Sequence, residues 1–271
     1  MADERTKTSF AEIAVRDAGG AGPPVLLIHG NSASKAIFAR QFESSLAQTL
    51  RLIAIDLPGH GQSSDAFEPA KGYTIGGYAR AAVEVLEALG VARAAVFGWS
   101  LGGHVALDMI ARVPGIAGVM ISGTPPIPAG PEGFGLGFRP TPLMQLTGAP
   151  AWTIDEAEAF ARAGARPFAR FMLDDAMRTH GIARATMVAD ALSGGVADQR
   201  RIAETAPTPL AIVNGAADAF VNADYFATVA YANLWDEQVH NLAGLGHAPF
   251  WEAPATFNPL LERFARETAP G

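Results

Sequence analysis

The chain has no cysteine among its 271 residues. Disulfides, thiolate metal sites, iron–sulfur clusters and a cysteine nucleophile are therefore excluded. It also has no run of basic residues, since 20 Lys and Arg stand against 27 Asp and Glu, a formal net charge of −7. Nucleic-acid binding depends on clustered basic side chains that displace counterions, so we expect no nucleic-acid partner.

An apolar run suited to a membrane is missing as well. The uncharged stretch 113–131 contains five prolines and four glycines, which favour a buried strand followed by a loop. The first ten residues carry four charges and no apolar stretch follows them, so no signal peptide is predicted. We expect a cytoplasmic protein with no membrane partner, while the oligomeric state stays open.

Short apolar runs alternate with helical periods along most of the chain. This alternation predicts an α/β fold, with a mostly parallel, doubly wound sheet and helices on both of its faces. The runs expected to form strands are 24–28, 52–55, 94–97, 119–122, 210–213 and 239–242. The clearest helix covers about 74–89, where apolar residues recur at spacings of three and four before Gly90 stops the pattern.

The alternation breaks after Ser122. Residues 123–142 are rich in Pro and Gly, and helical patterns then continue to about 205 without a strand. We interpret residues 125–205, here called the inserted segment, as a mainly helical cap that divides a core into parts 1–124 and 206–271. Thr153 and Glu156 have the spacing of a capping box at the start of one of its helices. The segment carries many large apolar side chains, some of which are expected to line a pocket; a purely structural embellishment is the alternative.

The strongest chemical signal is a predicted strand that runs into Gly-Trp-Ser-Leu-Gly at 98–102 and then into a helical pattern. In such a strained turn the Ser100 hydroxyl projects at the carboxyl edge of the sheet, and Gly98 and Gly102 leave room for the neighbouring chain. Backbone N–H groups at the helix start, beginning with Leu101, would stabilise a negative charge beside Ser100. The alternative is a glycine-rich loop packed on the core.

Two further polar residues follow later strands. A hydroxyl is a weak nucleophile unless a base removes its proton and a carboxylate orients that base. Asp218 comes after the strand at 210–213 and His247 after the strand at 239–242, where parallel sheets place their sites. Asp224 competes for the role of the acid, but we expect it to start the next helix.

These motifs, in this order, resemble the α/β-hydrolase superfamily. The resemblance rests on five segments, at residues 29–30, 56–63, 98–102, 215–218 and 246–247. It implies Ser100 as nucleophile, His247 as general base and acid, and Asp218 as the orienting carboxylate. It also implies an oxyanion hole formed by the backbone N–H groups of Asn31 and Leu101.

A narrower resemblance rests on residues 29–32, 97–104, 123–126 and 246–250. Together they resemble the metal-independent N-acyl-homoserine lactonases of this superfamily, which implies a small-molecule lactone substrate with a fatty acyl amide. No metal-site or nucleotide-binding pattern is present in the sequence, so no cofactor and no metal are expected. The alternatives are a general carboxylesterase, carbon–carbon bond hydrolysis, haloperoxidase or perhydrolase chemistry, or a non-catalytic binding protein on the same scaffold.

Several side chains beside these motifs are expected to extend the site. Trp99, next to the nucleophile, and Phe220, Val221 and Phe250, next to the acid and the base, would form an apolar wall, with core packing as the alternative for each. At Asn31 the superfamily usually has an apolar or small residue, so this side chain could itself reach the substrate.

The other histidines and one proline have structural interpretations. We expect His29 to brace the oxyanion loop, His60 to belong to a turn, and His104, one helical turn after Ser100, to be a hydrogen-bonded structural residue. Pro259 is predicted to mark the first turn of the C-terminal helix or to kink that helix.

Overall fold

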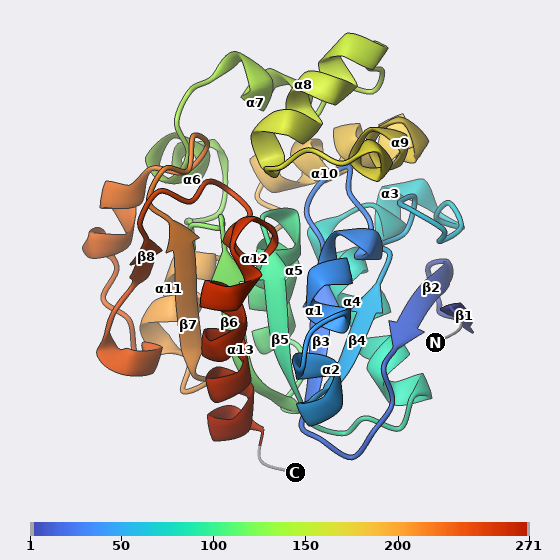
Figure 1. The fold of residues 1–271 in the computed structure, drawn as a ribbon. Coiled ribbons are helices and arrows are strands. Elements are labelled where there is room, and N and C mark those ends of the chain that lie inside the picture. Colours follow the sequence, from blue (N-terminus) through green and yellow to red (C-terminus); the bar gives the residue numbers. More distant parts are fainter. Residues whose placement is uncertain (1–2, 270–271) are drawn as a thin grey trace.

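The computed structural model describes residues 3–269, which form an eight-stranded sheet in the order β1-β2-β4-β3-β5-β6-β7-β8 (Figure 1). The strands are β1 (Asp3–Lys7), β2 (Glu12–Asp17), β3 (Pro24–Ile28), β4 (Arg51–Ile55), β5 (Ala94–Trp99), β6 (Ile116–Ser122), β7 (Leu210–Gly215) and β8 (His240–Leu242). From β4 to β8 the neighbours pair in parallel, whereas β1 and β2 form an antiparallel edge. The predicted fold class is confirmed, and each predicted strand is present; β1 and β2 were not predicted.

Helices cover both faces of the sheet (Figure 1). One face carries α4 (Ile75–Ala88), α5 (Leu101–Ile110) and α11 (Gln199–Thr205), and the other carries α1 (Ala39–Phe42), α2 (Leu46–Thr49), α12 (Pro249–Glu252) and α13 (Pro254–Thr268). The remaining helices are α3 (Pro69–Gly72), α6 (Pro131–Gly137), α7 (Pro142–Leu146), α8 (Ile154–Gly164), α9 (Arg170–Arg178), α10 (Gly181–Leu192) and the 3-10 turns η1 (Lys35–Phe38), η2 (Ala223–Thr228) and η3 (Trp235–Glu237).

The central strands are continuous apolar runs because both of their faces are buried. In β3, Val25 and Leu27 pack into the core beneath α13, while Leu26 and Ile28 pack into the core beneath α4 and α5. All four side chains have no exposed surface. Strands covered on one face only would alternate apolar with polar residues, so the pattern of β3 reflects helices on both sides.

Helix ends follow the expected signals at α4 but not at α13. Gly90 has a φ of 66° beyond the helix end, where the sequence predicts the stop. At the other end the Thr74 side chain accepts a hydrogen bond from the backbone N–H of Gly77, a cap that was not predicted. Of the two alternatives predicted for Pro259, a place in the first turn of the C-terminal helix is wrong, and the alternative of a kink stays a prediction. That helix already begins at Pro254, where a missing N–H costs nothing, so Pro259 lies inside α13.

The inserted segment contributes α6 to α11 between β6 and β7. Helices α7, α8, α9 and α10 lie above the carboxyl edge of the sheet (Figure 1), whereas α11 packs against α5. At the start of α8 the Thr153 side chain accepts from the Glu156 N–H and the Glu156 carboxylate accepts from the Thr153 N–H, which confirms the predicted capping box. Among residues 3–269, no helix combines the length and apolar character needed to cross a membrane.

A buried ion pair supports the turn after β4. Lys35 is 3% exposed and Asp56 is fully buried, and their Nζ and Oδ2 atoms lie 2.8 Å apart. We expect Lys35→Met to lower the free energy of unfolding by about 3–5 kcal/mol, because it leaves a carboxylate buried without its cation. Urea unfolding at pH 7 measures the loss. Lys71→Met is the matched control: it breaks an exposed pair with Glu68 and should cost less than about 1 kcal/mol, and equal losses would contradict the prediction.

Candidate active site

Ser100 lies in a strained turn between β5 and α5. Its φ of 54° and ψ of −118° are unusual for a residue with a side chain. A Cβ at position 98 would lie 2.2 Å from the carbonyl oxygen of Gly102, and one at position 102 would lie 2.1 Å from that of Ile28. Both glycines are therefore required for the close approach of neighbouring backbone, and this turn presents Ser100 to a cavity at the carboxyl edge of the sheet.

His247 and Asp218 form a buried pair beside the same cavity. The imidazole Nδ1 lies 2.7 Å from the Asp218 Oδ2, and each residue is 7% exposed. Asp218 Oδ1 accepts hydrogen bonds from the backbone N–H groups of Phe220 and Val221, at 2.8 and 3.3 Å. Burial raises the pKa of the Asp218 carboxyl, but the His247 imidazole and these hydrogen bonds outweigh it and hold that pKa below its usual value. An ionised Asp218 thus orients His247 so that Nε2 is left for proton exchange.

Asp224 does not contact the imidazole. It is exposed in the first turn of η2, which confirms the expectation that it starts the next helix. The carboxylate beside His247 is that of Asp218.

The loop after β3 also reaches the cavity, with Gly30 and Asn31. Asn31 and Leu101 line the cavity together with Ser100. His29 fixes this loop, since its Nδ1 lies 2.8 Å from the Gly30 carbonyl oxygen and its Nε2 accepts from the Leu57 N–H at 3.0 Å. The Asn31 side chain donates to the Thr147 carbonyl at 3.0 Å, so it binds the inserted segment.

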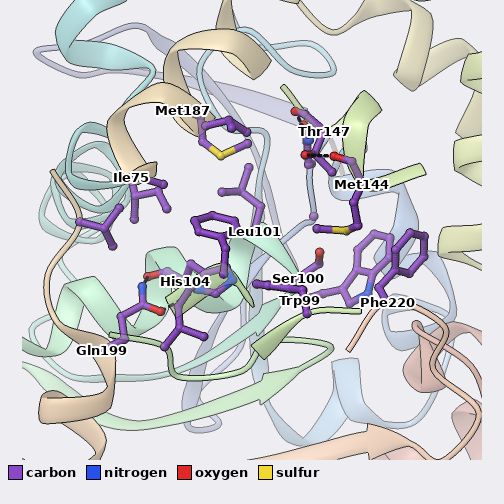
Figure 2. Close-up of a pocket in the computed structure, with 18 of the residues that line it drawn as sticks. Ile75, Trp99, Ser100, Leu101, His104, Met144, Thr147, Met187, Gln199 and Phe220 are labelled. Carbon is purple, nitrogen blue, oxygen red and sulfur yellow. Dashed lines mark hydrogen bonds between the residues drawn. The ribbon is translucent and has the colours of Figure 1, made fainter. Parts of the chain in front are cut away.

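The cavity measures about 100 Å³ and extends to both sides of Ser100 (Figure 2). Its aromatic side holds Trp99 and Phe220, whose rings contact the His247 ring at centroid distances of 5.6 and 4.9 Å. Its opposite side holds His104, whose ring centroid lies 5.8 Å from that of Phe138, together with aliphatic side chains such as Ile75 and Met187. The lining residues that best define the two sides are Ile75, Trp99, His104, Met144, Thr147, Phe160, Met187, Val188, Gln199 and Phe220.

A model described as the alpha/beta hydrolase family matches residues 25–260. The chain belongs to the alpha/beta hydrolase family. Among solved structures, N-acyl homoserine lactonase AidH complexed with N-butanoyl homoserine is 44% identical, with a TM-score of 0.97 over 100% of this chain and 98% of that one. A putative aryl esterase from Burkholderia cenocepacia is 25% identical, with a TM-score of 0.81 over 98% and 99% of the two chains.

Several curated relatives of this hydrolase are named as ester-cleaving enzymes. A pimeloyl-[acyl-carrier protein] methyl ester esterase from Aromatoleum aromaticum is 28% identical over 90% of this chain and 98% of its own length. The resemblance to the superfamily, and to N-acyl homoserine lactonases within it, is thereby confirmed. The chain is an alpha/beta hydrolase whose relatives support ester cleavage.

Two residues expected in the pocket wall of this hydrolase lie elsewhere. Phe250 is fully buried and packs against Phe97 and Phe38, because α12 begins at Pro249 and turns the ring into the core. Val221 is buried in the core cluster and contributes only its N–H, to Asp218. Trp99 and Phe220 do line the cavity.

Several lining residues of the hydrolase were not predicted individually. Ile75, Thr147 and Gln199 come from α4, the turn after α7 and α11, and no motif in the sequence connects them. The only sequence signal was the number of large apolar residues in the inserted segment. Within residues 3–269, no group of three or more metal-ligating side chains is arranged to hold a metal ion.

Burial keeps two histidines of the hydrolase neutral. It lowers the pKa of His29 to about 4 and that of His60 to about 3. His60 Nδ1 lies 3.0 Å from the Pro58 carbonyl oxygen, within the turn where the sequence places it. In the unfolded chain both side chains bind protons below about pH 6.5, whereas in the folded chain His29 does so only near pH 4 and His60 only near pH 3. Protonation therefore favours the unfolded chain, and the free energy of unfolding decreases as the pH falls from 6.5 toward 4.

We therefore expect His60→Asn to make the fold less sensitive to acid. Asparagine can keep the donor to Pro58 but does not titrate. The loss in free energy of unfolding between pH 7.5 and pH 5.0, measured with urea, should be about 2 kcal/mol smaller in the variant than in the wild type. An unchanged loss would show that His60 binds protons equally well in both states.

Proposed function

We propose that this hydrolase opens the ring of N-acyl homoserine lactones with Ser100, His247 and Asp218 as a catalytic triad. The observation that carries the proposal is the similarity to AidH lactonase, which extends over the whole chain, inserted segment included, at 44% identity. The buried pair of His247 and Asp218 beside the cavity that Ser100 lines supports it.

The reaction begins with attack of Ser100 Oγ on the lactone carbonyl carbon, while His247 Nε2 takes the hydroxyl proton. The backbone N–H groups of Asn31 and Leu101 stabilise the negative charge on the carbonyl oxygen. When the intermediate collapses, the bond to the ring oxygen breaks and His247 returns the proton to that oxygen. Water then releases the open-chain acid from Ser100 by the same two steps, and the Asp218 carboxylate stabilises the charged imidazole throughout.

The inserted segment acts as a cap in this proposal, above a core formed by 1–124 and 206–271. Met144, Phe160 and Met187 of the segment line the cavity opposite the core residues. The hydrogen bond from Asn31 to the Thr147 carbonyl joins the segment to the oxyanion loop. A cap in this position excludes water from the reacting carbonyl and supplies apolar surface for an acyl chain.

The proposal is tested by comparing a ring with its open analogue. We expect kcat/KM for N-hexanoyl homoserine lactone to exceed that for the methyl ester of N-hexanoyl-2-aminobutyric acid by about tenfold or more, because a compact ring loses less conformational freedom on binding than a flexible open chain. Product formation is followed by liquid chromatography. Preference for the linear ester would favour a general carboxylesterase.

The charge of the substrate should matter as well. Among the described residues 3–269, no lysine, arginine, aspartate or glutamate lines the cavity. We expect the p-nitrophenyl ester of hexanoic acid to be cleaved at least about 100-fold more efficiently than the mono-p-nitrophenyl ester of adipic acid, since the second would bury an unpaired carboxylate. The rate for the neutral ester should depend little on salt. Preference for the charged ester, with a rate that collapses at high ionic strength, would contradict this expectation.

A further inference from the structure

His104 lies on the side of the cavity opposite Trp99 and Phe220, one turn along α5 from Ser100 (Figure 2). Its Nδ1 lies 2.7 Å from Gln199 Oε1, and the Gln199 side-chain nitrogen donates to the His104 carbonyl at 3.1 Å. The second contact fixes which end of the Gln199 amide faces the ring. Because Oε1 can only accept a hydrogen bond, the Nδ1 of His104 must carry the proton.

The other ring nitrogen is then a hydrogen-bond acceptor. Burial lowers the pKa of His104 to about 4, so the ring is neutral at pH 7 and Nε2 carries a lone pair. Within residues 3–269 this nitrogen has no hydrogen-bond partner. Nδ1 is turned to Gln199, so Nε2 is the ring nitrogen left for a ligand in the cavity that His104 lines.

The direction of the reaction places the acyl chain on this side. A lactone carbonyl carbon carries the ring oxygen on one side and the carbon with the acylamino group on the other. The ring oxygen must receive its proton from His247, whose ring contacts Trp99 and Phe220. In Figure 2 these two residues lie on one side of Ser100, and His104 lies on the other. The acylamino group therefore extends toward His104.

The distances agree with contact near the third carbon of the acyl chain. Four residues of helix separate His104 from Ser100 by about 6 Å along the axis. Five bonds, or about 6 Å in an extended chain, separate the lactone carbonyl carbon from C3 of the acyl group. Apolar neighbours such as Ile75 and Met187 surround the chain on this side, so an unpaired acceptor there is costly and a donor is favoured.

We propose, on the basis of the function proposed above, that His104 Nε2 accepts a hydrogen bond from a hydroxyl group on the acyl chain, so that the hydrolase selects 3-hydroxyacyl over 3-oxoacyl homoserine lactones. A ketone oxygen only accepts hydrogen bonds and gains nothing from this lone pair. Gln199 acts as a positioning residue, because it holds the proton on Nδ1.

The test compares kcat/KM for N-hexanoyl, N-(3-hydroxyhexanoyl) and N-(3-oxohexanoyl) homoserine lactones. In the wild type, the 3-hydroxy compound should exceed the unsubstituted one by about three- to tenfold. The ratio of kcat/KM for the 3-hydroxy compound to that for the unsubstituted compound should fall about tenfold in two variants. His104→Asn keeps a donor for Gln199 but lacks Nε2, and His104→Phe removes both ring nitrogens. The ratio of kcat/KM for the 3-oxo compound to that for the unsubstituted compound should not fall in either variant. His240→Asn, which changes a histidine that does not line the cavity and lies beside Asp236, is the matched control and should leave both ratios unchanged.

The outcomes separate this inference from the function on which it rests. If the wild type hydrolyses no lactone, the proposed function fails and the inference fails with it. If it hydrolyses all three lactones but the wild-type ratio of 3-hydroxy to unsubstituted compound is at or below one, or that ratio is as high in both His104 variants as in the wild type, only the inference is overturned. A wild-type preference for the 3-oxo compound that disappears in His104→Asn would show that Nε2 carries the proton, and would overturn the inference as well.

Discussion

Replacing either Ser100 or His247 with alanine is expected to reduce kcat by about 10⁴-fold or more. Without the serine hydroxyl no covalent intermediate forms, and without the imidazole nothing removes the proton of Ser100 or protonates the leaving oxygen. Because the two groups act in the same proton transfer, the double variant should be hardly slower than either single variant. Rates are measured with N-hexanoyl homoserine lactone at saturating concentration.

The control is that folding stays intact in these variants. Circular dichroism spectra and urea midpoints should match those of the wild type, apart from small changes at the buried His247. If the two losses multiplied in the double variant, Ser100 and His247 would not belong to one proton-transfer system, and the assignment of the triad would be wrong.

Asp218→Asn is expected to lower kcat by about 10³- to 10⁴-fold with little change in KM. The substitution keeps the shape of the side chain but removes the charge that stabilises the imidazolium, and an asparagine nitrogen facing Nδ1 would favour the wrong tautomer. Substrate contacts are unaffected, because Asp218 is not among the residues that line the cavity.

Asp224→Asn is the matched control for this prediction. The carboxylate is six positions away in the chain, but it is exposed in η2 and does not contact His247. Its replacement should leave kcat within about twofold of the wild type. A large loss in Asp224→Asn together with a small loss in Asp218→Asn would move the acid to position 224.

Much of the sheet could be predicted because each central strand is an apolar run that ends at a polar residue or glycine. The strand β3 has the predicted ends, and β5 to β7 extend the predicted runs by a few residues. The edge strand β1 was missed for a physical reason: its sequence Asp-Glu-Arg-Thr-Lys buries little, and its hydrogen bonds to β2 define it. Pairing of this kind leaves no periodic apolar signal.

The chemistry-bearing residues could be placed because they follow strand ends, and parallel strands bring those ends to one edge. The wall of the cavity could not be placed in this way. Phe250 is three residues from His247 in sequence, yet α12 turns it into the core, whereas Gln199 lies 95 positions from His104 and contacts it. The position of Phe250 depends on how α12 packs against the sheet, and the contact of Gln199 depends on how the inserted segment packs against α5; local sequence patterns encode neither.

The most direct test of the central claim is mass spectrometry of N-hexanoyl homoserine lactone incubated with the protein and a chelator. The account predicts that the wild type forms the ring-opened N-hexanoyl homoserine, 18 Da heavier by one added water, with chelator present, and that Ser100→Ala forms no more of it than buffer alone. Ring opening by Ser100→Ala at the wild-type rate, or no ring opening by the wild type, would contradict it.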